Sequence, residues 1–157
     1  MAIRKIVKNG DPILRKISKR VDNIDKRTLQ LIDDMRDTLE RSGGVGLAAV
    51  QVGILKRIVL VDNGEEVLEL INPEIISTEG EQQEIEGCLS CPDVWGVTKR
   101  PMVVTVSALD RNGELKTYTG DGLTARCFCH ELDHLDGKLF IDDVVRFVDK
   151  EELESDE

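Results

Sequence analysis

The sequence predicts one domain of the α+β class, spanning residues 1–157. Two segments with helical periodicity enclose a central stretch of short, β-branched segments separated by turn residues. A chain of 157 residues, 40% of them hydrophobic, can bury a core without a framework of disulfide bonds. No internal repeat and no linker-like run of Pro or Gly divides it.

The first helix is expected from about residue 25 to residue 41. Apolar residues recur there every three or four positions, and Gly43 and Gly44 follow as a stop signal; the apolar positions are Leu29, Ile32, Met35 and Leu39.

The middle of the chain predicts strands joined by hairpins. Residues 57–62, 67–76 and 103–109 are short and rich in β-branched side chains. Asn63-Gly64 and Asn112-Gly113 supply turn residues at their ends.

The second helix is expected over residues 123–136, preceded by Asp121-Gly122 and closed by Gly137. Four of its residues are predicted to line its buried side: Leu123, Cys127, Leu132 and Leu135.

Charge and hydropathy exclude several partners. With 21 basic and 31 acidic residues the net charge is -10, which repels nucleic acid and makes DNA an unsuitable ligand. No apolar run reaches membrane-spanning length and the N-terminal residues lack the apolar region of a secretory signal, so we expect a cytoplasmic protein. Residues from about 147 to 157 form an acidic tail that is expected to be solvated or disordered.

The only two histidines of the chain predict a metal site. His130 and His134 stand four residues apart in the run HELDH, so a helix places both imidazoles on one face, within reach of one ion. Glu131 lies beside that face and can act as a general base toward a water activated by the metal, as in metallohydrolases.

A catalytic metal site usually has a third protein ligand, and the residues alone leave its identity open. Position 140, where one HExxH pattern carries a third histidine, is Phe140, and Glu151, Glu152 and Glu154 lie in the acidic tail. Cys88, in the run EGCLSCP, is favoured modestly over Cys91, which Pro92 follows. A four-thiolate zinc site that also uses Cys127 and Cys129 is a weaker alternative, because the second pair has only one intervening residue.

A third informative run, GGVGLAAVQVG, follows the first helix. Its small residues allow a substrate backbone to approach closely, and Gln51 can donate an amide hydrogen to a developing oxyanion. The run lacks the pattern of a phosphate loop or of a dinucleotide site.

Taken in order, GVGLAAVQ, EGCLS and HELDH resemble the three signature motifs of the peptide deformylases, and DPILR at residues 11–15 resembles the N-terminal run of that family. The resemblance implies an α+β fold with mixed and antiparallel sheets packed around a central helix that carries the HExxH motif. It implies Cys88, His130 and His134 as metal ligands, with Fe2+ as the metal and Zn2+, Ni2+ or Co2+ able to substitute.

The activity implied is hydrolytic removal of the formyl group from the N-terminal formylmethionine of new polypeptides. Glu131 would move the proton, while the Gln51 side chain and the Leu89 backbone N–H would hold the oxyanion. The resemblance also implies that Val45 and Gly46 pair with the substrate backbone and that Leu123 and Cys127 help form the methionine pocket.

The same resemblance implies a supporting ion pair between Glu86 and Arg100 near Cys88, with a charge pair on a solvated surface as the alternative. Many relatives have Gln where this chain has Cys129, which adds an oxidisable thiol. The partners implied are N-formylmethionyl peptides and a transient ribosome contact, to which an acidic tail is poorly suited, and we expect a monomer.

Two other functions remain to be separated from this one. A metallohydrolase acting on another acyl-peptide substrate would share the metal site, since the motifs determine the metal chemistry more firmly than the pocket. A metal-stabilised module that binds peptide ends without catalysis would not need Glu131.

Overall fold

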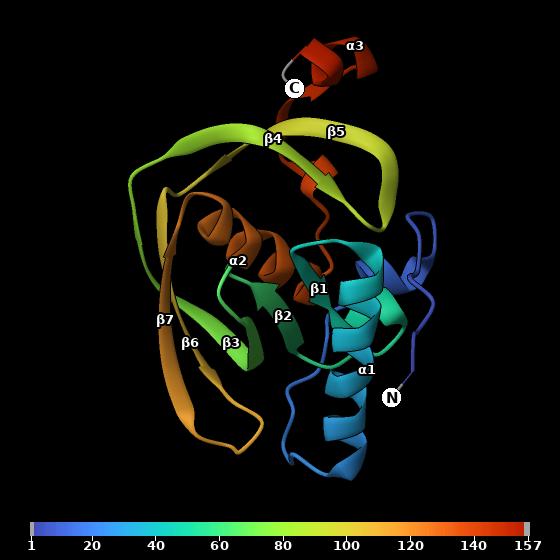
Figure 1. The fold of residues 1–157 in the computed structure, drawn as a ribbon, viewed down its shortest axis with the longest axis vertical. Helices are drawn as coiled ribbons and strands as arrows, with labels where there is room; N and C mark the ends of the chain where they lie inside the picture. The colour runs from blue at the N-terminus through green and yellow to red at the C-terminus, as the bar shows by residue number, and fades with distance from the viewer. Residues whose placement is uncertain (1, 156–157) are drawn as a thin grey trace.

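A computed structural model describes residues 2–155 (Figure 1). Its helices and strands, in chain order, are η1 (Pro12–Arg15), α1 (Lys26–Ser42), β1 (Gly46–Ala48), η2 (Ala49–Val52), β2 (Ile58–Asp62), β3 (Val67–Glu79), β4 (Gln82–Cys88), β5 (Cys91–Arg100), β6 (Val103–Leu109), β7 (Leu115–Asp121), α2 (Gly122–Leu135), η3 (Phe140–Asp142), β8 (Val144–Val148) and α3 (Lys150–Ser155), where η marks a 3-10 helix. Within residues 2–155, no helix combines the length and apolar character that a membrane crossing requires.

The strands form two sheets, with α2 lying between them (Figure 1). A five-stranded sheet has the order β1-β2-β3-β6-β7 and a three-stranded sheet has the order β4-β5-β8, and every strand pair in both is antiparallel. The predicted α+β class with antiparallel sheets is therefore confirmed, whereas the expectation that sheets would also be mixed is not met by the described strand pairs.

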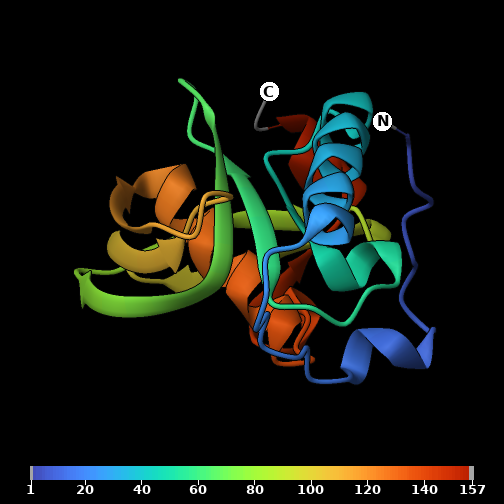
Figure 2. The same ribbon diagram turned by 90° about the horizontal axis from the view of Figure 1, so that it is seen from below.

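Strand β2 explains how the larger sheet holds both long helices. Successive side chains of a strand point to opposite faces, so Val59 and Val61 pack in the core cluster that contains α2 residues, whereas Ile58 and Leu60 pack in the cluster of α1. Figure 2 shows the two helices on opposite sides of this sheet. All four side chains are buried, which accounts for the continuous apolar run in the sequence.

Helix α1 begins and ends where the sequence predicts. The Asp25 side chain accepts a hydrogen bond from the Thr28 backbone N–H, which caps the N-terminus. Gly43 ends the helix in the left-handed conformation with φ 72°, which glycine adopts without a Cβ penalty.

The three predicted strands correspond to β2, β3 and β6, and both predicted hairpin turns join neighbouring antiparallel strands. Sequence reasoning did not identify the polar strands β4 and β7, whose exposed positions carry Gln, Glu, Lys and Thr. Their strand conformation depends on pairing with β5 and β6, which local composition does not reveal.

Helix α2 matches the second predicted helix and is buried along most of its length. Cys127, Leu132 and Leu135 are buried as predicted, but the prediction was wrong for Leu123, which is 53% exposed. Leu123 lies in the first turn of α2, where the helix borders an open cavity instead of the sheet.

The segment expected to be an acidic tail contains regular structure in its described part. Residues up to Val148 belong to β8, which pairs with β5, and α3 follows. The Asp149 carboxylate accepts a hydrogen bond from the Glu152 backbone N–H and so caps α3. Residues 147–155 are therefore described as regular structure, whereas residues 156 and 157 of the expected tail lie outside the described part.

A group of charged side chains joins α1 to the larger sheet. Glu69 of β3 accepts hydrogen bonds from Arg111 at 2.7 and 2.8 Å and from Arg36, and Arg111 also contacts Asp33 at 2.9 Å. Burial raises the pKa of Glu69, but the hydrogen bonds from Arg111 and Arg36 outweigh it and hold the pKa below its ordinary value of 4.5.

We expect Glu69→Gln to lower the free energy of unfolding by about 1 to 2 kcal/mol at neutral pH, a value reduced because both arginines are more than a third exposed. A carboxylate with a depressed folded pKa stabilises above its unfolded pKa, and this contribution disappears as pH falls through the folded pKa. The difference between wild type and variant, measured by urea denaturation, should therefore shrink as pH falls below 4.5. Glu74→Gln, at an exposed position of β3, is the control, and a pH-independent difference would contradict the prediction.

Candidate active site

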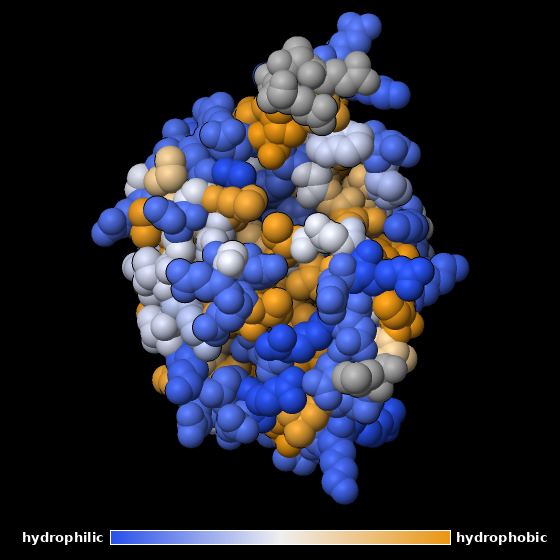
Figure 3. Space-filling view, viewed as in Figure 1, coloured by the Kyte–Doolittle hydropathy of each residue, from blue (hydrophilic) through white to orange (hydrophobic). Residues whose placement is uncertain are grey.

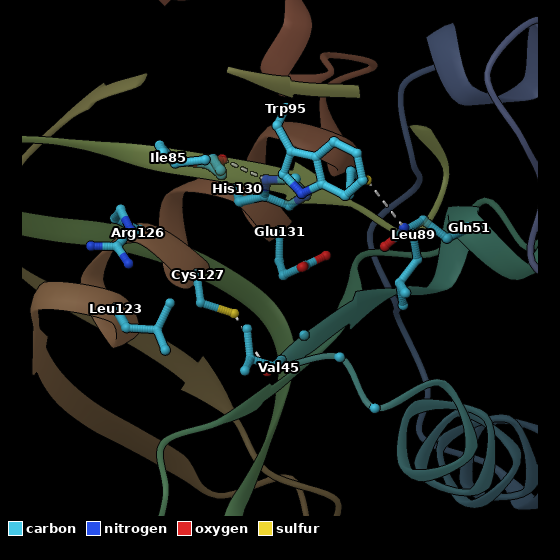
Figure 4. A pocket seen from close by; sticks show the side chains of 16 residues that line it. Val45, Gln51, Ile85, Leu89, Trp95, Leu123, Arg126, Cys127, His130 and Glu131 are labelled. Carbon is cyan, nitrogen blue, oxygen red and sulfur yellow. Dashed lines mark hydrogen bonds and ion pairs between the residues drawn. The ribbon is translucent and has the colours of Figure 1, made fainter. Parts of the chain in front are cut away.

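One face of α2 lines a cavity of about 390 Å³ (Figure 4). The lining residues of the helix follow helical spacing, so they share a face: Leu123, Arg126, Cys127, His130 and Glu131. Seen from the side shown in Figure 3, apolar residues reach the surface in the middle of the molecule, within a mostly hydrophilic margin.

The other walls come from two segments distant in sequence. Residues 43–46, between α1 and β1, form one side, and Gln51 lies at the end of that run. Residues 85–89 of the β4–β5 hairpin and Trp95 form the opposite side. The cavity therefore lies between the two sheets, with α2 at its base.

Cys88, His130 and His134 bring one sulfur and two imidazole nitrogens together, all within 4.8 Å of one another. The Cys88 Sγ lies 3.4 Å from the His134 Nε2, and the two imidazole rings are 5.0 Å apart and nearly perpendicular. A thiolate and two imidazoles at this separation can hold one divalent transition-metal ion. In the described part of the chain Cys91 does not belong to this group, and neither do Cys127 and Cys129.

The orientation of His130 is determined by Glu86. The His130 Nδ1 lies 2.6 Å from the Glu86 Oε1, which leaves Nε2 directed toward Cys88 and His134. Glu86 also accepts hydrogen bonds from the Arg100 Nη2 at 2.8 Å and from the Thr98 hydroxyl at 2.6 Å. Burial raises the pKa of Glu86, but the hydrogen bonds from His130 and Arg100 prevail and bring it to about 2. The expected ion pair of Glu86 with Arg100 is present and buried.

His134 is held neutral by its surroundings. Its side chain is fully buried, and burial lowers the pKa of its imidazole well below the ordinary value. A neutral imidazole keeps a lone pair for a metal ion. The His134 Nδ1 makes no hydrogen bond in the structure, so only its Nε2 side is engaged, toward Cys88.

Glu131 is a buried carboxylate that points into the cavity (Figure 4). Its side chain is 4% exposed, and its Oε1 atom has no hydrogen-bond partner. Burial raises the pKa of Glu131 to about 7, so the group can both accept and release a proton near neutral pH.

Gly46 and Gln51 show why the small-residue run is needed. A Cβ atom at Gly46 would lie 2.5 Å from the Cys127 Sγ and 2.6 Å from the Glu131 Oε2, so only glycine fits there. The Gln51 Oε1 accepts a hydrogen bond from the Ala48 N–H at 2.9 Å, which turns its NH2 group toward Ser90 at 3.2 Å and Cys88 at 3.7 Å.

The structure brings the predicted site residues together. Nine of them line the cavity, and His134 lies behind it as the second imidazole; the nine are Val45, Gly46, Gln51, Cys88, Leu89, Leu123, Cys127, His130 and Glu131. The Cys127 thiol contacts the Val45 carbonyl oxygen at 3.5 Å instead of joining a thiolate cluster.

Sequence reasoning missed three lining side chains: Ile85, Trp95 and Arg126. Arg126 was detectable, because it lies three residues after Leu123 and four before His130 on the same helix face. Trp95 had no local signal, since its place depends on how β5 folds back along β4.

Comparison with known proteins identifies the family in which this arrangement of site residues occurs. A family profile described as polypeptide deformylase matches residues 3–150. The chain belongs to the polypeptide deformylase family. A peptide deformylase of Acetivibrio thermocellus is 57% identical over 154 residues, which cover 98% of this chain and 91% of that protein.

Solved structures of deformylases agree in fold. The chain is similar to a peptide deformylase from Legionella pneumophila, with a TM-score of 0.88 and 46% identity over 91% of this chain and 86% of that one. It is also similar to a peptide deformylase from Synechococcus elongatus in complex with actinonin, with a TM-score of 0.87 and 43% identity over 97% and 82%. The chain is thus a metal-dependent hydrolase that removes the N-formyl group from new polypeptides.

Replacing Glu86 should weaken metal binding by this deformylase. We expect Glu86→Gln to lower affinity for a divalent ion about 10- to 100-fold, because His130 loses the carboxylate that orients its ring. Competition with a chromophoric chelator measures the affinity. Glu84→Gln, at an exposed position two residues earlier on β4, is the matched control. Equal affinities of the two variants would contradict the orienting role.

Enlarging Gly46 should displace the Glu131 carboxylate without removing Cys88, His130 or His134. We expect Gly46→Ala to lower kcat/KM for a formyl-Met peptide by at least about 100-fold, since the added methyl group displaces the Glu131 carboxylate. Metal content should stay close to that of the wild type. Gly53→Ala is unsuitable as a control because its φ is 85°, whereas Ala48→Gly changes a residue of the same strand without adding atoms. Unchanged turnover in Gly46→Ala would contradict the close packing described here.

Proposed function

We propose that this chain deformylates N-formylmethionyl peptides with Glu131 as the proton-transferring group, beside a metal held by Cys88, His130 and His134. The observation that carries the proposal is the position of Glu131. Its carboxylate is buried, has one unpartnered oxygen and borders the cavity that Cys88 and His130 also line, with His134 behind them. A buried carboxylate without a structural partner is costly, which supports a chemical role.

The donor set supports Fe2+ as the metal, with Zn2+, Ni2+ or Co2+ able to replace it. One sulfur and two imidazole nitrogens suit such ions better than magnesium or calcium, which prefer oxygen ligands. When bound, the ion supplies Lewis acidity toward the formyl oxygen and toward water.

Glu131 performs the two proton transfers of the reaction. It accepts a proton from the attacking water at one carboxylate oxygen and then delivers that proton to the departing amine nitrogen. The raised pKa of Glu131, about 7, suits both steps because neither protonation state is strongly favoured at neutral pH.

Gln51 and Leu89 stabilise the oxyanion. The Gln51 carbonyl oxygen is held by the Ala48 N–H, so its NH2 group is directed toward the cavity side that Cys88 occupies. The second proposed donor is the Leu89 backbone N–H; Leu89 follows Cys88 at the tip of the β4–β5 hairpin and lines the cavity, which supports this role. Donors held in place before the reaction stabilise developing negative charge efficiently.

Val45, Gly46, Leu123 and Cys127 bind the substrate. Gly46 begins the short edge strand β1, where an extended peptide can add by backbone hydrogen bonds. Leu123 and Cys127 offer apolar surface on α2, suited to a methionine side chain, with Leu123 at the exposed end. Arg126 lies on the same helix face, and Trp95 lines the cavity from the β4–β5 hairpin.

We further propose that the chain acts as one catalytic domain and as a monomer in the cytoplasm, where newly made formylated polypeptides arise. Any ribosome contact is transient and does not use α3, because Glu151 and Glu152 in its first turn would face RNA phosphate with like charge. Light scattering of the purified protein tests the monomeric state.

The decisive experiment compares formate release by the wild type, Glu131→Gln and Glu84→Gln, each loaded with Ni2+. We expect Glu131→Gln to bind one metal ion per chain and to lose at least about 100-fold in kcat, because it cannot accept the proton. Glu84→Gln, exposed on β4, should match the wild type. Substantial turnover by Glu131→Gln would contradict the assigned base.

A parallel comparison of formyl-Met, acetyl-Met and unblocked Met peptides tests the substrate. Release of formate alone, without release of acetate or of the methionine residue, is the expected pattern. Faster release of acetate than of formate would contradict the assignment of the formyl group.

A further inference from the structure

Cys91 has no role in the proposed deformylation reaction. It is 3% exposed and packs with Leu139 and Phe140, and Cys88 packs against this same cluster. It is excluded from the group of atoms that can hold a metal ion. Its neighbour Cys88 belongs to that group and also lines the cavity.

Cys88 and Cys91 face each other across the end of one hairpin. They are paired residues in the antiparallel register of β4 and β5, separated only by Leu89 and Ser90 at the turn. Opposite residues of antiparallel strands have Cα atoms about 4.5 to 5.5 Å apart, and disulfides span Cα distances of about 4.4 to 6.8 Å.

We propose that Cys88 and Cys91 form a reversible disulfide when the protein meets a hydroperoxide, and that this modification takes the sulfur ligand away from the metal site. The inference rests on the proposed ligand role of Cys88 only for its effect on activity. Formation of the bond rests on the hairpin geometry alone.

The two cysteines differ in access, which assigns their order of reaction. Cys88 is half-buried and borders the cavity, so a small peroxide can reach its sulfur. Cys91 is buried in its apolar cluster and does not line the cavity, so peroxide reaches it only through Cys88. Cys88 is therefore oxidised first and Cys91 resolves it.

The chemistry balances with hydrogen peroxide as the oxidant. The Cys88 sulfur attacks one peroxide oxygen, the S–O bond forms as the O–O bond breaks, and the second oxygen leaves as water with the thiol proton. The Cys91 sulfur then attacks the Cys88 sulfur, the S–O bond breaks, and the hydroxyl leaves as a second water with the Cys91 proton. Two thiols lose two electrons in total, and one peroxide is reduced to two waters.

The disulfide would both stop the enzyme and protect it. The Cys88 sulfur bonded to Cys91 can no longer act as a thiolate beside His134, so metal affinity falls. Rapid capture of the oxidised Cys88 sulfur by Cys91 also prevents further addition of oxygen, which is irreversible. A dithiol reductant then restores both thiols.

Peptide mapping distinguishes a disulfide between Cys88 and Cys91 from oxidation of Cys127 or Cys129. Cleavage after Lys and Arg releases residues 58–99, which contain Cys88 and Cys91 and no other cysteine. Cys127 and Cys129 are released together in residues 127–138. The experiment treats the full-length protein, both Ni2+-loaded and metal-stripped, with hydrogen peroxide, then alkylates free thiols and measures the mass of each peptide.

We expect the peptide of residues 58–99 from wild type to lose two hydrogen atoms and to resist alkylation until dithiothreitol is added. Cys91→Ser should instead gain oxygen atoms at Cys88 and recover on the order of tenfold less metal binding after reduction than the wild type. Cys91→Ala serves as a second variant if serine disturbs the apolar cluster. Cys129→Ser is the matched control and should keep the wild-type crosslink.

Gain of oxygen at Cys88 in the wild type without loss of two hydrogen atoms would overturn the proposal, as would equal recovery of wild type and Cys91→Ser. Release of Ni2+ in step with the crosslink, measured with a chromophoric chelator, is expected. A crosslink without Ni2+ release would overturn the proposed loss of the metal ligand. Failure of deformylation in untreated protein would concern the proposed function and not this bond, because mass and metal release are measured without substrate.

Discussion

The hydrogen bond between Glu86 and His130 is the interaction on which the rest of the site depends. It joins strand β4 of the smaller sheet to the central helix α2, and it directs the free nitrogen of His130 toward Cys88 and His134. Arg100 and Thr98 satisfy the remaining positions of the buried carboxylate, and Arg100 continues to Asp133 on α2. The same group of charges therefore packs the two layers together and orients His130, a candidate metal ligand.

The two buried carboxylates of the site, Glu86 and Glu131, have pKa values shifted in opposite directions. Glu86 is fully partnered and has a depressed pKa, whereas Glu131, on the same helix as His130, has an unpartnered oxygen and a raised pKa. Two buried carboxylates thus differ in proton affinity because only one of them receives hydrogen bonds from cations. On its β1 side Glu131 packs against Gly46, where a Cβ atom would lie 2.6 Å from the Glu131 Oε2.

Local sequence patterns predicted the helices and strands whose own residues mark their ends or their buried faces. Helix α1 carries its stop at Gly43, and strand β2 is apolar at every core position because it lies between two helices. The patterns failed where exposure depends on distant neighbours. Leu123 follows the helical apolar period, yet it is exposed and borders a cavity. Strands β4 and β7 are polar, and they adopt a strand conformation because they pair with β5 and β6.

The sequence by itself determined the part of the site that lies on a single helix. The spacing of His130, Glu131 and His134 sets their relative directions through local geometry, whatever the rest of the chain does. Only the tertiary structure decided which cysteine joins the two imidazoles, that Trp95 borders the cavity, and that Cys91 opposes Cys88. These relations depend on the register of the β4–β5 hairpin and on its docking against α2, and residue order alone does not specify either of them.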